Sequence, residues 1–155
     1  MTSKHKAGTK RWGRESKRDR FCALSFQLID SEAFKHLSTS ALCVLVLLKR
    51  CFNGNNNGEI HLSCREVAKK AKISRNTATK AFKELQQKGF ITKVQQGYFA
   101  SGCPVATIWK LNTDKNSGEC RPSNEWKLWH VGDDFLENPP TNYLAQISAT
   151  QSKIL

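Results

Sequence analysis

The residues best equipped for specific chemistry lie between Arg75 and Gln87, where polar and basic side chains recur at helical spacing. One face of such a helix carries no acidic side chain and presents Asn76, Thr79, Lys80, Lys83 and Gln87. Amide side chains form paired hydrogen bonds with adenine, lysine donates to guanine, and a threonine methyl contacts thymine. Arg75, at the start of the segment, is suited to bind a phosphate or a base. The pattern predicts contact with base edges, although any solvated helix face also shows polar residues opposite an apolar stripe.

Catalytic chemistry has little support in the sequence. The histidines stand in unrelated contexts, and no nucleophile lies in a known elbow or glycine-rich phosphate loop. Metal binding by Cys51, His61 and Cys64 would lack the usual ligand spacing. The acidic group Asp133, Asp134 and Glu137 is more typical of a surface turn than of a cation site. We therefore expect no enzyme, no cofactor and no metal, and six free thiols in a reducing cytoplasm.

Two serines predict the starts of the helices that must position these residues. Ser63 with Glu66 forms a capping box, which opens a helix with Val67, Ala68 and Ala71 on its inner face. Ser74 then caps the helix 75–88, which ends at Gly89. The buried face of this second helix is expected to be Ala78, Ala81, Phe82 and Leu85.

Further elements are expected on either side of this pair. Ser38 caps a helix over 38–52 that is apolar on every face, and a short helical turn capped by Asp30 or Ser31 precedes it. Residues 59–62 and 90–94 read as strands, and 106–111 as the returning strand. Two turn-forming groups, 95–97 and 101–104, bracket a loop, and Phe21 to Ile29 alternates like an extended lead-in.

The charge balance favours a polyanionic partner. The chain has 25 Lys and Arg against 13 Asp and Glu, a net charge of +12. Residues 1–20 hold eight basic and two acidic side chains, and residues 113–155 hold four and six. Basic N-terminal and central segments favour a nucleic-acid partner, although a basic surface can also simply keep a protein soluble. No stretch reaches the about 18 apolar residues of a membrane span, and the N-terminus lacks the apolar core of a secretory signal, so we expect a cytoplasmic protein without a membrane partner.

The order helix, short strand, helix, turn, helix, strand, loop, strand resembles the winged helix-turn-helix proteins, in particular small bacterial regulators and replication-associated proteins of plasmids and phages. The segment "LSCREVAKKAKISRNTATKAFKELQQKGFI" carries the resemblance, and "LSTSALCVLVLLKR", "NGNNNGEIHLS" and "ATIWKL" extend it loosely over residues 26–112. The family often has glycine in the tight turn where this chain has Lys72, so this lysine must take an uncommon backbone conformation if the turn keeps its geometry.

The resemblance implies an α+β, mainly α fold: a three-helix core with a small antiparallel β-sheet and a wing. Three parts are expected, namely a disordered basic arm (1–20), the winged helix-turn-helix domain (21–112), and a C-terminal extension (113–155), partly ordered through Trp126 and Trp129 and then a tail. The wing segment, Val94 to Trp109, has no charged side chain, which is unusual for a wing that enters a minor groove.

The function expected from these features is binding of double-stranded DNA, with helix 75–88 in the major groove and helix 63–71 on the backbone. The residues expected to contact DNA are Ser63, Arg65, Lys69, Ser74, Arg75, Asn76, Thr77, Thr79, Lys80 and Lys83. Transcription regulation is the favoured role. The alternatives are DNA replication, through initiation at plasmid or phage origin repeats, and protein–protein docking.

A homodimer is the second partner expected. The helix 38–52 is apolar all round, and a chain of this size has few elements to cover Leu42, Val46 and Leu47. The lead-in turn with Phe34 and Leu37 is the alternative cover within one chain.

Overall fold

The computed structural model describes residues 21–116, 118, 121–137 and 139. The expected arm (1–20) and most of the expected tail lie outside the described residues. The helices are α1 (Phe26–Ile29), α2 (Glu32–Lys35), α3 (Thr39–Cys51), α4 (Cys64–Ala71), α5 (Arg75–Gln87) and the 3-10 helix η1 (Glu125–Leu128). The strands are β1 (Ile60–His61), β2 (Ile91–Gln95), β3 (Tyr98–Ala100), β4 (Cys103–Val105) and β5 (Ile108–Leu111).

A serine is the N-cap residue of each of the five α-helices in the described part of the chain. The hydroxyl at each N-cap accepts a hydrogen bond from a backbone N–H three residues ahead, as Ser38 does from Ala41 and Ser74 from Thr77. The same contact is made by Ser25, Ser31 and Ser63. Each cap satisfies a donor that the first helical turn leaves unpaired. The expected caps at Ser31, Ser38, Ser63 and Ser74 are confirmed.

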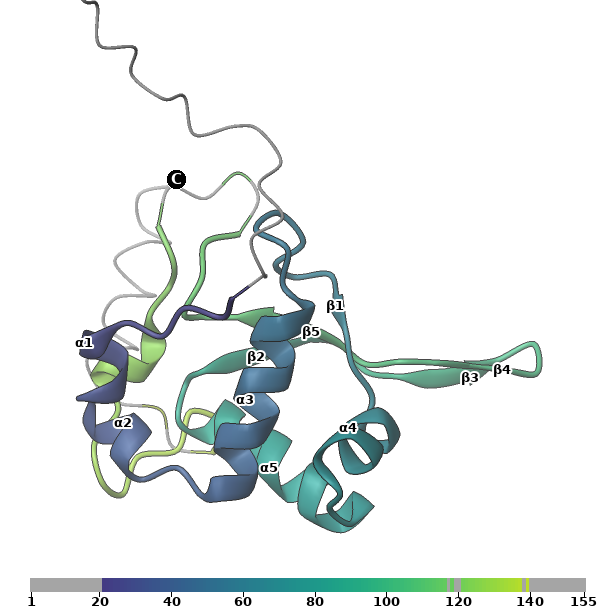
Figure 1. Ribbon diagram of the computed structural model, residues 1–155, viewed down its shortest axis with the longest axis horizontal. Helices are drawn as coiled ribbons and strands as arrows, with labels where there is room; N and C mark the ends of the chain where they lie inside the picture. Colours follow the sequence, from purple (N-terminus) through teal and green to yellow (C-terminus); the bar gives the residue numbers. More distant parts are fainter. Residues whose placement is uncertain (1–20, 117, 119–120, 138, 140–155) are drawn as a thin grey trace, which may run out of the picture.

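The strands form a small antiparallel sheet and a separate hairpin. β5 pairs with β1 on one side and with β2 on the other, in the order β1-β5-β2. The register places Ile60 and Lys93 opposite Trp109, and Ile91 opposite Leu111. β3 and β4 pair only with each other among the described strands, and Figure 1 shows them projecting far from the body of the domain.

The core lies between this sheet and helices α3, α4 and α5. Val44, Leu45 and Leu48 of α3 and Leu85 of α5 are fully buried. Phe82 stacks on Trp109 with ring centroids 4.5 Å apart, and the Trp109 indole N–H donates to the Leu62 carbonyl. This is the α+β winged helix-turn-helix architecture, with the hairpin β3–β4 in the place of the wing.

Two buried asparagines join loops to the sheet. Asn57 accepts a hydrogen bond from the Leu111 backbone N–H and donates to the carbonyls of Leu111 and Asp114. Asn112 donates to the Gly89 carbonyl and to Glu125. Because their polar atoms are paired, these side chains are buried without the cost of an unmet hydrogen bond.

Two sequence expectations were wrong. The lead-in Phe21 to Ile29 is not extended throughout, because Ser25 caps the helical turn α1. The segment 98–100 between the turn-forming groups is not a loop but strand β3, and it pairs with β4, which begins within the expected turn 101–104. Ser101 (φ 48°) and Gly102 (φ 82°) both have positive φ, as the two-residue turns that match the twist of paired strands require.

The segment after β5 returns to the domain. Trp126 and Trp129 are 4% and 7% exposed and belong to the same core, although they follow residue 112, the expected end of the domain. Trp126 stacks on Phe90, with centroids 6.3 Å apart. The packing agrees with the expectation that these two tryptophans turn the chain back.

Candidate nucleic-acid interface

Helices α4 and α5 lie side by side at the end of the molecule from which the hairpin β3–β4 also extends (Figure 1). Val67 of α4 and Ala78 of α5 are fully buried at the seam, and Ala71 and Ile73 are partly buried against the same core. Small side chains at such positions allow two helices to approach closely. The seam orients the exposed faces of both helices.

The turn between α4 and α5 is built on Lys72. Its backbone is left-handed, with φ 54° and ψ 42°, and its N–H donates to the Ala68 carbonyl. The Ile73 N–H donates to the same carbonyl at 3.1 Å. Lysine therefore takes the conformation that glycine adopts without steric cost, as the turn geometry required.

The buried and exposed faces of α5 are those expected from the sequence. Ala78, Ala81, Phe82 and Leu85 are at most 2% exposed. The exposed side chains on the helix are Arg75, Asn76, Thr79, Lys80 and Lys83. Among the described residues, no hydrogen bond or ion pair engages the side chains of Arg75, Asn76 or Lys80. These three groups are open to an external partner.

The hydroxyl groups in the expected site have structural partners. Ser63 and Glu66 make the reciprocal contacts of the capping box. The Ser74 hydroxyl accepts from the Thr77 backbone N–H and lies 2.8 Å from the Thr77 hydroxyl. The Thr79 hydroxyl donates to the Arg75 carbonyl. Since its proton is used, Thr79 offers a partner its methyl group and oxygen lone pairs.

Basic side chains predominate around the turn. Residues 63–83 contain seven Lys or Arg and one acid, Glu66, whose carboxylate lies 3.9 Å from the Lys70 ammonium. Arg65, Lys69 and Lys72 are also exposed. The first helix of the pair therefore adds positive charge beside the open N-terminal part of α5, an arrangement that attracts phosphate.

Acidic residues reach the C-terminal end of the α5 face from the segment after η1. Glu137 lies 3.4 Å from the Lys83 ammonium, and Gln87 donates to Asp134 at 2.6 Å. The Phe135 backbone N–H donates to the Gln87 carbonyl. The helix itself carries no acidic side chain on this face, as expected. On the folded surface, however, Asp134 and Glu137 lie against the face, so the expectation is wrong there. The Gln87 side chain is bonded to Asp134. The acidic group 133–137 was visible in the sequence, but its place against α5 depends on tertiary packing.

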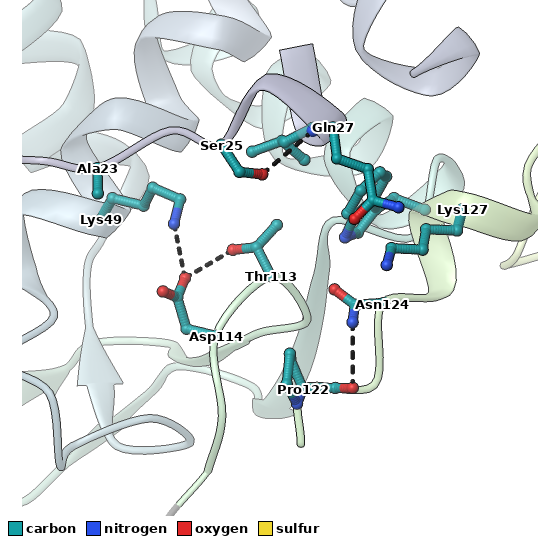
Figure 2. Close-up of a pocket in the computed structure, with 11 residues that line it drawn as sticks. Ala23, Ser25, Gln27, Lys49, Thr113, Asp114, Pro122, Asn124 and Lys127 are labelled. Carbon is teal, nitrogen blue, oxygen red and sulfur yellow. Dashed lines mark hydrogen bonds and ion pairs between the residues drawn. The ribbon is translucent and has the colours of Figure 1, made fainter. Parts of the chain in front are cut away.

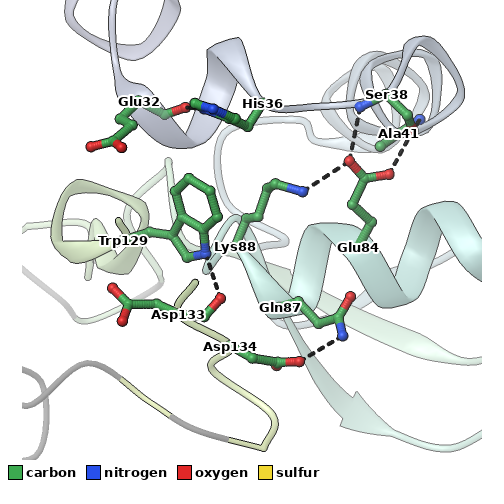
Figure 3. A network of polar contacts seen from close by, with 10 residues as sticks. All are labelled: Glu32, His36, Ser38, Ala41, Glu84, Gln87, Lys88, Trp129, Asp133 and Asp134. Carbon is green, nitrogen blue, oxygen red and sulfur yellow. Dashed lines mark hydrogen bonds and ion pairs between the residues drawn. The ribbon is translucent and has the colours of Figure 1, made fainter. Parts of the chain in front are cut away.

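A polar network connects this end of α5 to the start of α3 (Figure 3). Glu84 accepts hydrogen bonds from the Ser38 backbone N–H, the Ser38 hydroxyl and Lys88. Partial burial acts to raise the pKa of Glu84, but the hydrogen bonds from Ser38 and Lys88 outweigh it and hold the pKa below its ordinary value. The Lys88 ammonium also lies 5.5 Å from the centre of the Trp129 ring. The network holds α5 against α3 and the C-terminal segment.

The hairpin β3–β4 presents apolar surface. Phe99 is 74% exposed and Tyr98 is 53% exposed, with Val94 just before them in β2. Gly97 is required at the base, since a Cβ there would lie 2.8 Å from the Val105 carbonyl oxygen. Because residues 98–105 include no charged side chain, the hairpin cannot form an ion pair with a phosphate group.

The described residues hold no group of three His, Cys, Asp or Glu side chains placed to bind a metal ion. The described cysteines, among them Cys51 and Cys64, are free thiols. Within the described part of the chain, no helix has the length and apolar composition needed to cross a membrane.

Comparison with known proteins gives one match. Residues 35–91 match the family model of a helix-turn-helix domain, from the end of α2 to the first residue of β2. Searches of curated proteins and of solved structures found no significant match. The matched range contains α3, the seam, the Lys72 turn and the exposed face of α5. Residues 35–91 of this chain are therefore similar in sequence to a helix-turn-helix domain.

Proposed function

We propose that this protein binds duplex DNA with α5 in the major groove and α4 against the sugar-phosphate backbone. The observation that carries the proposal is the open face at the start of α5, where Arg75, Asn76 and Lys80 are exposed without partners beside the basic α4. A major groove about 12 Å wide accepts one α-helix. The N-terminal residues of a recognition helix are those that approach the base edges.

The contacts divide by chemistry. Asn76 and Lys80 lie one turn apart on the exposed face, and together with the Thr79 methyl they can read neighbouring bases. Arg65 and Lys69 on α4 supply charge for phosphates, which position the protein without reading sequence. The hydroxyls of Ser63, Ser74 and Thr77 shape the helix ends and can add phosphate contacts.

The acidic segment 133–137 restricts this reading face to its N-terminal part. Lys83 has Glu137 as a neighbour, and Gln87 is held by Asp134. A phosphate near Lys83 would meet the Glu137 carboxylate as well. We therefore place the base-reading residues in the first two turns of α5, from Arg75 to Lys80.

The test is the salt dependence of duplex binding, measured by fluorescence anisotropy with the full chain. If about five to eight phosphates are neutralised, log K falls against log salt with a slope of roughly −4 to −7. Arg65→Ala should reduce the slope by about 1, whereas Lys115→Ala, an exposed lysine remote in sequence from the helix pair, should leave it unchanged. A flat salt response would contradict the proposal.

For the biological role we propose transcription regulation, in keeping with the resemblance to small regulators. The same domain would also serve an initiator of plasmid or phage replication. Selection of bound sequences from a random duplex pool distinguishes them. One enriched palindrome supports a dimeric regulator, whereas tandem direct repeats support an initiator.

Protein docking is a second candidate, and the exposed apolar hairpin favours it. Phe99 and Tyr98 project on an uncharged hairpin, which is typical of a surface that contacts protein rather than phosphate. A docking module without DNA binding would give the flat salt response described above, and its partner would be lost with Phe99→Ser.

A further inference from the structure

A cavity of about 340 Å³ lies on another part of the molecule, between α1, the end of α3 and the segment that follows β5. Its volume falls within the range of small-molecule sites. Figure 2 shows Lys49, Asp114 and Thr113 on one side and Gln27, Lys127 and Asn124 on the other. Neither α4 nor α5 lines it, so it is separate from the candidate DNA interface.

One wall of the cavity holds a paired charge. The Lys49 ammonium lies 2.7 Å from the Asp114 carboxylate, and the Lys49 side chain is 7% exposed. The Thr113 hydroxyl donates to the same Asp114 oxygen at 2.6 Å. Asp114 is thus neutralised within the protein and does not repel an anion in the cavity.

Lys127 and Trp126 line the opposite side of the cavity, and the buried Trp126 indole N–H has no hydrogen-bond acceptor. The Lys127 ammonium lies 5.3 Å from the centre of the Trp126 ring, and no carboxylate pairs with it among the described residues. Trp126 is 4% exposed, and its indole N–H is the one buried side-chain donor of the described residues without an acceptor. A buried donor left unpaired is costly, and such groups are rare in folded proteins.

We propose that this cavity binds a small organic anion bearing one carboxylate or phosphate group. Lys49 and Lys127 against Asp114 leave one positive charge around the cavity, which suits one negative charge on the ligand. Lys127 balances the charge of the ligand. An oxygen of the ligand accepts the Trp126 N–H after a small shift of the neighbouring side chains, because this nitrogen is fully buried in the unliganded protein. Leu28, Pro122 and the Trp126 ring supply apolar contact for the remainder of the ligand.

The experiment follows the indole N–H resonance of Trp126 in the full chain by ¹H–¹⁵N NMR, with the peak assigned through Trp126→Phe. The probes are N-acetylglycine, inorganic phosphate and the uncharged N-acetylglycinamide. Saturable shifts are expected with an anion and not with the amide, at dissociation constants of about 1–10 mM for such small probes. A response to N-acetylglycine alone assigns a carboxylate ligand, and a response to phosphate alone assigns a phosphate ligand.

Two variants test the roles of the residues. Lys127→Gln should raise the dissociation constant about tenfold, whereas Lys115→Gln, an exposed lysine that does not line the cavity, should leave it unchanged. Trp126→Phe keeps a ring for stacking on Phe90 but removes the donor, and should weaken binding as followed on the Thr113 and Asn124 amide resonances.

The proposal fails if neither anion gives a saturable shift at about 50 mM. It also fails if the amide binds as well as the acid, or if both Lys127→Gln and Trp126→Phe bind like the unaltered chain. None of these measurements involves DNA, so they test the anion site independently of the proposed DNA binding.

Discussion

At the scale of single residues, Asn76 is the side chain proposed to recognise a base of the DNA sequence. Asn76→Ala removes up to two hydrogen bonds to one base and should cost about 1–3 kcal/mol on the preferred site, with little change on non-specific duplex. Lys69→Ala should weaken both equally if Lys69 meets only phosphate. Competition binding with preferred and scrambled duplexes measures the difference. If Asn76→Ala folds normally and keeps the same preference among sites, α5 does not read the bases.

Lys72 is a second residue whose behaviour follows from its geometry. Because its φ is 54°, Lys72→Gly should raise the free energy of unfolding by about 0.5–1 kcal/mol in urea denaturation. Lys72→Ala removes the same charge but keeps a Cβ, so it should give no such gain. Equal stabilisation by both variants would show that charge, not backbone conformation, is responsible.

At the scale of elements, Glu84 connects α5 to the N-terminus of α3. Glu84→Gln loses charge-assisted hydrogen bonds from Ser38 and Lys88 and should lower the free energy of unfolding by about 1 kcal/mol at pH 7, allowing for the partial exposure of the carboxylate. Glu59→Gln, at an exposed acid in the loop before β1, is the control and should have little effect.

The same pair of proteins should show a defined pH dependence. The pKa of Glu84 is lowered in the folded state, so its contribution is fully present above the unfolded pKa of about 4.3. It is lost as the pH falls through the folded pKa. Urea unfolding at several pH values should therefore show the difference between unaltered chain and Glu84→Gln shrinking below about pH 4. A difference that stays constant on acidification would contradict this account.

The hairpin β3–β4 is the element whose role the DNA proposal leaves open. Since it has no charge, Phe99→Ser should change the salt slope by much less than 1, whatever its effect on affinity. The variant should also unfold like the unaltered chain, because Phe99 is 74% exposed. A slope that falls by 1 or more would show that the hairpin helps to hold a phosphate contact.

At the scale of the whole molecule, the homodimer stays a prediction. Within one chain the core buries Val44, Leu45 and Leu48 of α3 and partly covers Leu47, while Val46 is 38% exposed. We expect a weak dimer through this exposed side of α3, which sedimentation at tens of micromolar would detect, and Val46→Lys should make it monomeric. A monomer for the unaltered chain would mean that the lead-in turns supply sufficient cover.

The organisation of charge also belongs to the whole molecule. The segment around the Lys72 turn is strongly basic, and the segment 113–155 is slightly acidic. Folding brings part of that acidic segment, through Asp134 and Glu137, to the C-terminal end of α5. The surface charge at the reading helix is therefore set jointly by two segments about 50 residues apart in the chain.

The sequence by itself determined the helices from α2 to α5 and the helix-turn-helix. Caps such as Ser63 and Ser74, and the period of Ala78, Phe82 and Leu85, act within a few residues, so their effect can be read locally. The same holds for the unusual backbone of Lys72. The exposed face of α5 followed from the same periodicity, and the exposure of Asn76 and Lys80 agrees with it.

Only the tertiary structure decided what depends on distant contacts. The hairpin β3–β4 is defined by pairing across its turn, a signal that the short segment 98–105 carries weakly. The contacts of Glu137 and Asp134 with α5, and the cavity beside Trp126, join segments far apart in the chain. Their positions depend on how the whole core packs, because no local preference of the chain specifies which distant side chains will meet.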